Sequence, residues 1–245
     1  MQTYNFNSIE AVIQAIETEQ GKGTRATLNS FLNGRSQADW LGGIGSQSDY
    51  METLKNGYLP AVETLQNCSA TNEGNNFNLV ASCSGQFNDV ATYLQGNPEC
   101  MADFQSIEEN KYLTINIAAA TPYTAKANDL MKKCEAVYMS VNSLEVQNIR
   151  VKIYITVSTH DKKAKKDMQV KVLIKDFTDN FISSYHGLLI GHLSTVRGLL
   201  YAYLSIHNKT ESLGHRIKTE IESNEILVDF VDHTSNQITQ IIINN

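Results

Sequence analysis

Hydrophobic and polar residues alternate most regularly in two runs near the middle of the chain. In residues 149–157 the odd-numbered positions are isoleucine or valine, and the positions between them are Arg, Lys, Tyr and Thr. In residues 168–175, Val170, Val172 and Ile174 alternate with polar positions that include Gln169 and Lys171. A period of two is typical of β-strands. Residues 158–167 have no helical pattern, so the two runs are predicted to form an antiparallel hairpin.

Helical periodicity is strongest before this hairpin. Residues 127–144 carry an apolar stripe at helical spacing, and it predicts an amphipathic helix. The stripe consists of Ala127, Leu130, Met131, Cys134, Val137, Tyr138, Val141 and Leu144. A second long helix is predicted over roughly residues 185–206. Residues 112–118 and 226–231 have strand-type composition, whereas the apolar tail 238–243 is compatible with either a strand or a short helix.

The first hundred residues indicate short helices separated by glycine. Ser8 is a candidate N-cap for a helix with Ile9, Val12, Ile13 and Ile16 on one face. Further helices are predicted over residues 24–33 and 47–56, with Gly57 just past the end of the latter, and a short one over 89–94. Residues 68–86 are rich in Asn, Ser and Gly and are predicted to form a loop or insertion.

The order of elements predicts the fold class. Strand, helix, strand, strand, helix and strand over residues 106–245 indicate an α/β domain, a layered sheet flanked by helices. Residues 1–105 are predicted to form a small, mostly helical N-terminal region.

Composition limits the classes of partner. The chain of 245 residues is 42% hydrophobic and 19% charged, which is typical of a folded protein. A net charge of -6 gives the whole molecule no attraction to nucleic acid or anionic lipid, so such binding would need a local basic patch. No apolar segment is long enough to span a bilayer, and the first residues do not have the pattern of a signal peptide. We therefore expect no membrane partner.

The cysteines and carboxylate pairs do not indicate a metal or cofactor. Cys68, Cys83, Cys100 and Cys134 are irregularly spaced, so neither a zinc site nor a disulfide framework is expected. The pairs Asp176 with Asp179 and Asp229 with Asp232 have no third ligand at motif spacing. We expect no cofactor.

The remaining candidates for catalysis have simpler interpretations. His186 and His192 lie on a predicted core helix, where packed histidines are common. The glycines of residues 42–45 lack a preceding strand and a Lys-Ser ending, so they do not indicate a phosphate-binding loop. No nucleophile–base motif is present in the sequence. We expect no enzymatic activity, although a hydrolase with an unfamiliar site stays open.

A basic loop is the main candidate for a binding site. His160, Lys162, Lys163, Lys165 and Lys166 lie within seven residues, and Lys171 and Lys175 follow on the next strand. A hairpin would gather these charges on one exposed side, where they could contact phosphates or a partner. Alternatively, the lysines form a solvated turn that keeps an edge hairpin soluble.

Part of the C-terminal region resembles a von Willebrand factor A type domain. The resemblance lies in the order of a strand, a long helix and a strand, followed by Val172-Leu173-Ile174-Lys175-Asp176-Phe177 and another helix. In that family, the first strand ends in an Asp-x-Ser-x-Ser motif that holds a divalent metal. This chain has Ala118 and Ala120 in the corresponding segment. Since alanine has no side-chain oxygen, the resemblance implies a domain without that metal.

A second resemblance is to a family of uncharacterised proteins found largely in tailed bacteriophages and mobile elements. It rests on Trp40, the segment Asn56-Gly57-Tyr58-Leu59-Pro60, the segment Gly96-Asn97-Pro98-Glu99-Cys100-Met101, and the later helix followed by a strand. These pieces cover most of residues 40–157. The resemblance implies a phage origin and brings no activity with it.

These observations lead to two expectations for function. The first is a non-enzymatic phage protein that binds a protein partner or a second copy of itself, in an assembly or host-interaction role. The alternative is an accessory protein of phage nucleic-acid metabolism that contacts the nucleic-acid backbone through the lysine-rich hairpin 160–175. In either case the expected location is the cytoplasm of the infected bacterial host or the virion.

Overall fold

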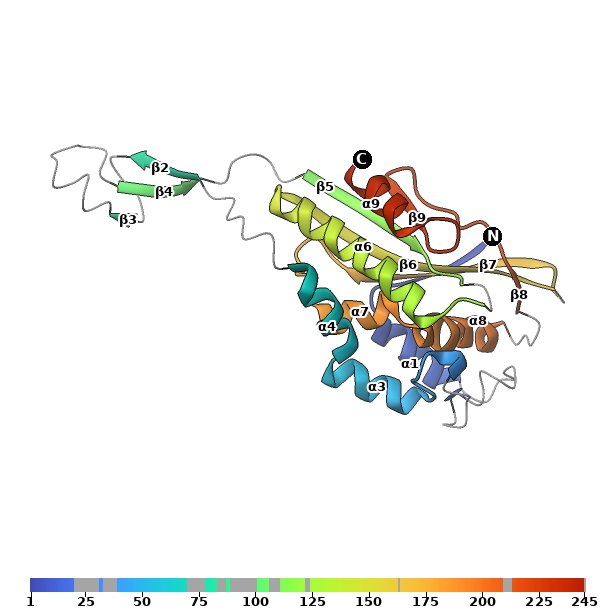
Figure 1. The fold of residues 1–245 in the computed structure, drawn as a ribbon. Coiled ribbons are helices and arrows are strands. Elements are labelled where there is room, and N and C mark those ends of the chain that lie inside the picture. Colours follow the sequence, from blue (N-terminus) through green and yellow to red (C-terminus); the bar gives the residue numbers. More distant parts are fainter. Residues whose placement is uncertain are drawn as a thin grey trace.

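The chain folds around one main β-sheet with helices packed against it. The computed structural model describes residues 1–19, 31–32, 39–69, 78–82, 87–88, 101–105, 111–121, 124–162, 164–208 and 213–244. The six strands of the main sheet are β1 (Gln2–Phe6), β5 (Lys111–Ala118), β6 (Ile149–Asp161), β7 (Lys166–Lys175), β8 (Leu213–Arg216) and β9 (Glu225–Asp229). Their order is β1-β7-β6-β5-β9, with β8 pairing with β6 beyond the end of β5 (Figure 1). The layered α/β fold predicted from the sequence is confirmed.

The central hairpin is as the alternation predicts. β6 and β7 are antiparallel, with Ile155 opposite Val172 and Val157 opposite Val170. β5 runs parallel to both β6 and β9, and β1 runs parallel to β7. The register shifts once, next to Ile153, so that Lys175 stands opposite Ile153. This irregularity changes the face on which Lys175 lies.

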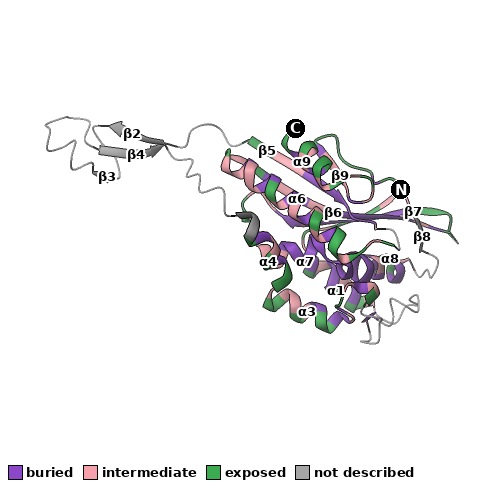
Figure 2. Cartoon of the chain, in the orientation of Figure 1, coloured by how far each residue is buried: buried purple, intermediate pink, exposed green. Residues whose placement is uncertain are grey.

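The described helices that touch the main sheet lie on one of its faces. They are α1 (Ile9–Glu19), α6 (Ala127–Val146), α7 (Ser183–Gly191), α8 (Tyr201–His207) and α9 (Ser235–Ile243), and the π-helix η2 (Ser194–Leu200) packs among them. The strand residues on this face include Ile115, Ile155 and Val170, which are fully buried in the core. Outside this layer, α3 (Gln47–Asn56) and α4 (Leu59–Ser69) pack on other helices (Figure 2). A short 3-10 helix, η1 (Asp39–Leu41), precedes α3.

The N-terminal region contributes to the same core as the rest of the chain. β1 extends the main sheet beyond β7, and Tyr4 and Phe6 on it pack edge-on against Tyr203 of α8. The predicted helix after Ser8 is present, and the Ser8 hydroxyl accepts a hydrogen bond from the backbone N–H of Ala11. Residues on both sides of position 105 therefore share one hydrophobic cluster.

Two N-terminal predictions lie wholly or mostly outside the described residues, and a third needs correction. The predicted helix 24–33 is described only at residues 31–32, and the predicted helix 89–94 is not described. The loop predicted for residues 68–86 contains a strand, β2 (Asn78–Ser82), which pairs with β4 (Met101–Gln105). β3 (Phe87–Asn88) also pairs with β4. A partner strand distant in sequence, which local composition does not reveal, makes residues 78–82 a strand.

The predicted helix over 185–206 is divided into three pieces. α7 ends at Gly191, and the backbone of His192 is extended, with φ -110° and ψ 134°. The π-helix η2 follows, and α8 completes the segment. The tail that the sequence left open is α9, which begins with a capping box between Thr234 and Gln237. The strand predicted to reach residue 231 ends at Asp229, because the Asp229 carboxylate accepts hydrogen bonds from the next turn.

Candidate functional site

Only some of the basic residues predicted for the hairpin are exposed at its tip. Lys162, Lys165 and Lys166 are exposed at the end of β6 and β7, which project at the right of Figure 1. Lys165 has a positive φ of 49° in the turn, and the Lys166 ammonium donates to the Gln2 side chain. His160 contacts Asp167 across the hairpin, with 2.7 Å between Nδ1 and Oδ1. Lys163 lies outside the described residues.

Lys171 and Lys175 do not belong to this exposed surface, which corrects the sequence-based prediction. Lys171 is 7% exposed and Lys175 is fully buried. Because of the register shift in β7, Lys175 lies on the helical face, where its Nζ is 2.6 Å from Glu145 at the end of α6. Lys171 lies on the opposite face and bonds to Glu225 and Glu222. The described members of this basic group therefore separate into an exposed tip and two lysines held in largely buried ion pairs.

The face of the main sheet that points away from the helices is lined with buried polar side chains. We call it the polar face. Its buried side chains are Asn116, Thr156, Ser158, Gln169, Lys171 and Glu225. Buried polar groups are rarely left without hydrogen bonds. Here some of the partners are other side chains of the same face, and others come from residues 217–224. Residues 217–224 connect β8 to β9 without forming a helix or strand, and we call them the strap.

The strap contacts the polar face through a row of hydrogen bonds. The Gln169 side chain bonds to the backbone of Glu220 twice: Nε2 donates to the carbonyl and Oε1 accepts from the N–H, both at 3.1 Å. Ser158 lies 3.1 Å from the Thr219 hydroxyl, and Lys171 Nζ lies 3.3 Å from Glu222 Oε1. These contacts involve the cross-strand pair Ser158 and Gln169 and the next residue on the same face of β7, Lys171, all reached from one continuous segment.

Glu225 is the acidic centre beneath the strap. Its carboxylate accepts hydrogen bonds from Lys171, from Asn116 Nδ2 at 3.0 Å and from the backbone N–H of Glu222 at 3.2 Å. Burial alone would lower the pKa of Lys171, but the hydrogen bonds and charges of Glu225 and Glu222 raise the pKa of its ammonium above the ordinary value. Asn116 Oδ1 and Thr156 Oγ1 are buried beside this centre without a hydrogen-bond partner among the described residues. The polar face therefore holds further polar groups that could bond to another molecule.

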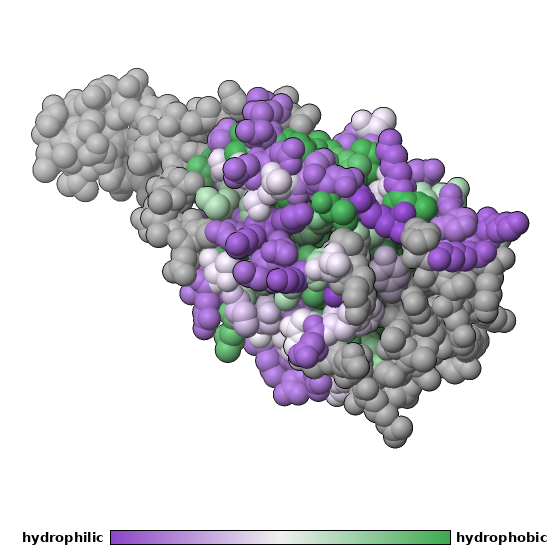
Figure 3. All heavy atoms as spheres, turned by 45° about the vertical axis from the view of Figure 1, so that its right-hand side comes forward, coloured by the Kyte–Doolittle hydropathy of each residue, from purple (hydrophilic) through white to green (hydrophobic). Residues whose placement is uncertain are grey.

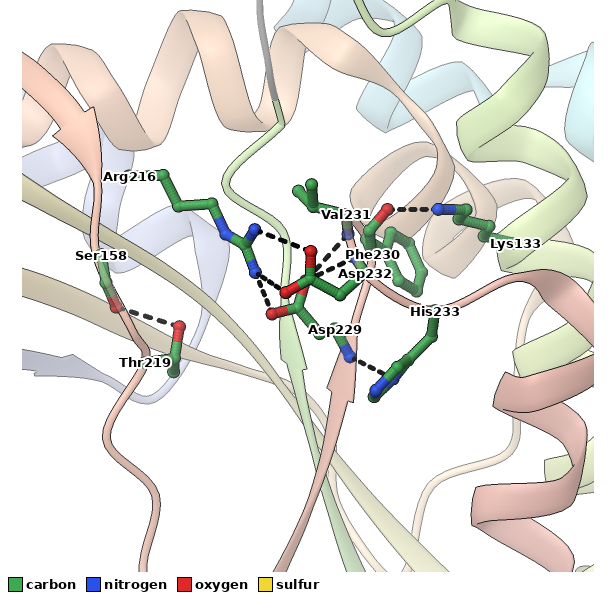
Figure 4. A network of polar contacts seen from close by, with 9 residues as sticks. All are labelled: Lys133, Ser158, Arg216, Thr219, Asp229, Phe230, Val231, Asp232 and His233. Carbon is green, nitrogen blue, oxygen red and sulfur yellow. Dashed lines mark hydrogen bonds and ion pairs between the residues drawn. The ribbon is translucent and has the colours of Figure 1, made fainter.

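A cavity of about 440 Å³ opens at the end of β9, beside the strap. Figure 4 shows Arg216 directed at both Asp229 and Asp232. The Arg216 hydrogen bond lowers the pKa of Asp232 below its usual value. The Asp229 backbone N–H donates to His233 Nδ1 at 3.0 Å. Ligands of open α/β sheets commonly bind at the carboxyl ends of strands, but here the two carboxylates are already occupied by Arg216.

The carboxylate pairs considered for metal binding have other partners. Asp229 and Asp232 bind Arg216, while Asp176 forms an ion pair with Lys152 at 2.9 Å. Asp179 accepts from the backbone N–H of Asp176 at 2.9 Å. No group of three His, Cys, Asp or Glu residues suited to a metal occurs within the described part of the chain. The paired carboxylates therefore serve local turns and ion pairs.

His192 and Ser194 have the geometry of a nucleophile and its base but are inaccessible. Ser194 Oγ lies 2.6 Å from His192 Nδ1, and His192 Nε2 lies 3.0 Å from the Gly42 carbonyl oxygen. Burial lowers the pKa of His192 to about 4, so its ring is neutral at pH 7, and Nε2 donates to Gly42. Both side chains are at most 1% exposed. Their contacts attach the turn at Gly42 to the break between α7 and η2.

His186 has a comparable structural role. Its Nδ1 contacts the backbone of Ile182 at the start of α7, and its Nε2 lies 3.2 Å from the Ile174 carbonyl oxygen. Burial lowers the pKa of His186 to about 4. The ring therefore joins the start of α7 to the end of β7.

The half of the polar face that the strap does not cover carries aromatic and basic side chains, of which Tyr112 and Arg150 are exposed and the others are half-buried. We call this group the aromatic patch: Tyr112, Arg150, Lys152, Tyr154 and Phe177. Tyr112 is 63% exposed, and its ring packs edge-on against Phe177 with 4.9 Å between centroids. Lys152 Nζ lies 4.6 Å above the Phe177 ring, and Arg150 is the register partner of Tyr112. The alternation pattern alone does not reveal this site, although the polar positions of the 149–157 run contain three of its residues.

One face of the molecule is largely hydrophilic. On the face shown in Figure 3, hydrophilic side chains cover most of the described surface, and the hydrophobic ones form small separate groups. Large contiguous apolar patches usually mark obligate interfaces. The exposed Tyr112 ring on the sheet is therefore a more specific indication of binding than the general character of this face.

Comparisons with known proteins identify a family but no activity. No curated protein and no solved structure matches the chain. Neither the phage resemblance nor the resemblance to a von Willebrand factor A type domain is assigned by these comparisons. Within the described residues, no helix is both long and apolar enough to cross a membrane. The model of a domain of unknown function, DUF7192, matches residues 1–243, and the chain therefore belongs to the DUF7192 family.

Proposed function

We propose that this protein acts by binding another protein, and that the aromatic patch is the contact surface. The observation that carries the proposal is Tyr112, a large aromatic side chain 63% exposed on a strand of the central sheet. Tyrosine and arginine are enriched among the residues that contribute most to protein–protein interfaces. Here Tyr112 and Arg150 are neighbours on adjacent strands.

The patch is held in position before a partner arrives. Phe177 supports the Tyr112 ring from the side, and Lys152 lies over Phe177 while paired with Asp176. Side chains that are already ordered lose less conformational entropy on binding. Arg150 is exposed, so its guanidinium can pair with a carboxylate of the partner.

Site-specific crosslinking tests this proposal. A photocrosslinking amino acid in place of Tyr112 should give one discrete crosslinked product in cells that express the chain at its natural level. The same amino acid in place of Glu52, exposed on α3, is the matched control and should not give that product. Arg150→Glu should reduce the product at least tenfold. Identical products at both positions, or none at position 112, would refute the proposal, whereas a product of twice the chain mass would identify the partner as a second copy.

Nucleic-acid binding through the hairpin is the second candidate, because Lys162, Lys165 and Lys166 are exposed together at a projecting tip. The structure removes Lys171 and Lys175 from this surface, because both are engaged in buried ion pairs.

For the protein-binding proposal, the family resemblance over residues 40–157 supports a phage setting and a role in assembly or host interaction. Proteomics of virions and of infected-cell cytoplasm would distinguish the two locations.

A further inference from the structure

We infer that the strap is the built-in occupant of a peptide-binding site, and that the partner supplies an extended segment of the same chemistry. That chemistry is a hydroxyl followed, three residues later, by a carboxylate, as in Thr219 and Glu222. The inference rests on the proposed protein-binding function and names the partner's recognition element. It also extends the contact surface from the aromatic patch to the covered half of the polar face.

The first observation is how Gln169 recognises the strap backbone. Its amide forms two hydrogen bonds with the Glu220 peptide unit, one to the carbonyl and one from the N–H. A side-chain amide placed in this way binds the main chain of an extended segment whatever its sequence, because every residue except proline has the same two groups. Ser158 holds Gln169 in place by donating to Oε1 at 2.9 Å.

Two side chains of the polar face then recognise particular residues. Ser158 contacts the Thr219 hydroxyl, and Lys171 contacts the Glu222 carboxylate. Lys171 is itself oriented by Glu225 and lies 4.4 Å above the Tyr154 ring. Its ammonium therefore stays in the same place whichever carboxylate occupies the Glu222 position.

The strap is attached in a way that allows its displacement. Ile221 is 38% exposed, Glu222 is 72% exposed at its side chain, and the contacts with the polar face are themselves polar. Each such hydrogen bond contributes little net stability, since water replaces it when the segment detaches. Segments that bury little apolar surface open locally at low cost.

Two cavities border the strap. One of about 470 Å³ is lined by strap residues together with Met1 and Asp167, and the cavity at Arg216 is also lined by Ile217 and Lys218 of the strap. An incoming peptide would therefore meet open space beside the strap. Asn116 Oδ1 and Thr156 Oγ1 are buried on the same face without a hydrogen-bond partner among the described residues.

A peptide-binding assay on the full chain tests the inference. In the test variant, residues 218–223 are replaced by an alternating Gly-Ser segment of equal length. A fluorescent peptide with the sequence of residues 216–224 should bind this variant at least 100-fold more tightly than the wild type. In the wild type the strap competes from the same chain, at an effective concentration of about millimolar. Binding is measured by fluorescence anisotropy.

Altered peptides and one altered protein supply the matched controls. Peptides that carry Thr219→Ala or Glu222→Lys should bind at least tenfold more weakly. Gln169→Ala in the Gly-Ser variant should remove binding, with the fold checked by circular dichroism. A folded Gly-Ser variant that fails to bind the peptide would overturn the inference. Binding of an oligonucleotide without binding of the peptide would also overturn it, and so would dimerisation of the protein by exchange of straps. The proposed function is tested separately, by the crosslink at Tyr112.

Hydrogen exchange on the wild type provides an answer even where the Gly-Ser variant does not fold. The amide of Glu220 should exchange at least 100-fold faster than that of Ile155 in the centre of β6. An excess of the unlabelled peptide should raise the Glu220 exchange rate further by displacing the strap. Equal protection of the two amides would show a strap that does not open, and the inference would then be wrong.

Discussion

The lysines of β7 show how one residue type serves different purposes in neighbouring positions. Lys166 is exposed, Lys171 lies under the strap, and Lys175 is enclosed on the helical face. Lys175 Nζ bonds to Glu145 and to the Val151 carbonyl oxygen at 2.9 Å. A buried charge of this kind depends on its partner.

Removing Glu145 should reduce the stability of the protein more than removing Lys175, its partner in the buried pair. Glu145→Ala leaves the fully buried ammonium without its counter-ion and should lower the free energy of unfolding by about 3 kcal/mol. Lys175→Met keeps the volume and leaves only a partly exposed carboxylate, so the loss should stay below about 1.5 kcal/mol. Urea denaturation measures both values, and the double variant Glu145→Leu/Lys175→Met serves as the control. Equal losses for the two single variants would contradict the prediction.

The buried histidines predict how stability depends on pH. Burial lowers the pKa of both His186 and His192 to about 4, and bonds to backbone groups only partly offset it. The unfolded chain binds protons below its ordinary histidine pKa of about 6.5, whereas the folded chain binds them only near pH 4. Stability should therefore be complete above pH 6.5 and fall between pH 6.5 and 4, by about 2 kcal/mol for each histidine at pH 5.

Urea unfolding at pH 7.5, 6 and 5 measures this dependence. The variant His192→Gln should reduce the histidine-dependent loss by about half, since His186 still titrates. A free energy of unfolding that stays constant over this range would show that the rings take up protons without unfolding.

At the scale of elements, α6 is the helix whose sequence pattern corresponds best to its packing. Leu130, Cys134, Val137, Val141 and Leu144 of the predicted stripe are buried. The helix packs on β6, α7 and α9, so one stripe serves the sheet and the neighbouring helices. By contrast, the segment 183–207 is buried almost all round and lacks such a stripe, because His192 and η2 interrupt its regular turn.

Leu130→Asp should be severely destabilising. An unpaired buried carboxylate costs several kcal/mol, a large share of the ~5–15 kcal/mol that holds a domain together. Met139→Asp on the same helix is the matched control, because Met139 is 49% exposed and its replacement should change stability by less than about 0.5 kcal/mol. Soluble expression and the thermal midpoint compare them. An unchanged midpoint for Leu130→Asp would contradict the packing of this face.

At the scale of the whole molecule, charge weighs against a role in nucleic-acid binding. The net charge is -6, and within the basic hairpin His160 is paired with Asp167. Backbone contacts to duplex DNA weaken with salt, with a slope of about −0.9 for each phosphate neutralised. An exposed tip of a few lysines would therefore bind weakly at physiological ionic strength.

We expect no appreciable binding of duplex or single-stranded DNA at physiological ionic strength, measured by anisotropy over a salt series. The variant with Lys162, Lys163, Lys165 and Lys166 changed to alanine should have the wild-type melting temperature, because exposed charges such as those of Lys162, Lys165 and Lys166 contribute little to stability. A salt-sensitive complex that this variant loses would instead favour the nucleic-acid function.

Local pattern was enough to predict the elements that carry regular periodicity. The alternation in residues 149–157 and 168–175 identified β6, β7 and their antiparallel pairing, and the stripe of residues 127–144 identified α6. Element order then indicated the layered α/β fold. These features depend on residues near one another in sequence, where a period of two or of 3.6 residues determines which side chains share a face.

Only the tertiary structure decided what covers each face. Alternation shows that Gln169 and Lys171 lie on the polar face, but a polar residue under the strap and one in water have the same pattern. The strap consists of residues 217–224, about fifty positions after Gln169 and Lys171 in the chain, and its local sequence does not predict the contact. The register shift that encloses Lys175, and the open half of the sheet that exposes Tyr112, likewise depend on which segments pair and which do not. Burying a polar group costs free energy unless hydrogen bonds replace those to water, and for Gln169 and Lys171 the partners are distant in sequence, so the chain must fold before such a site exists.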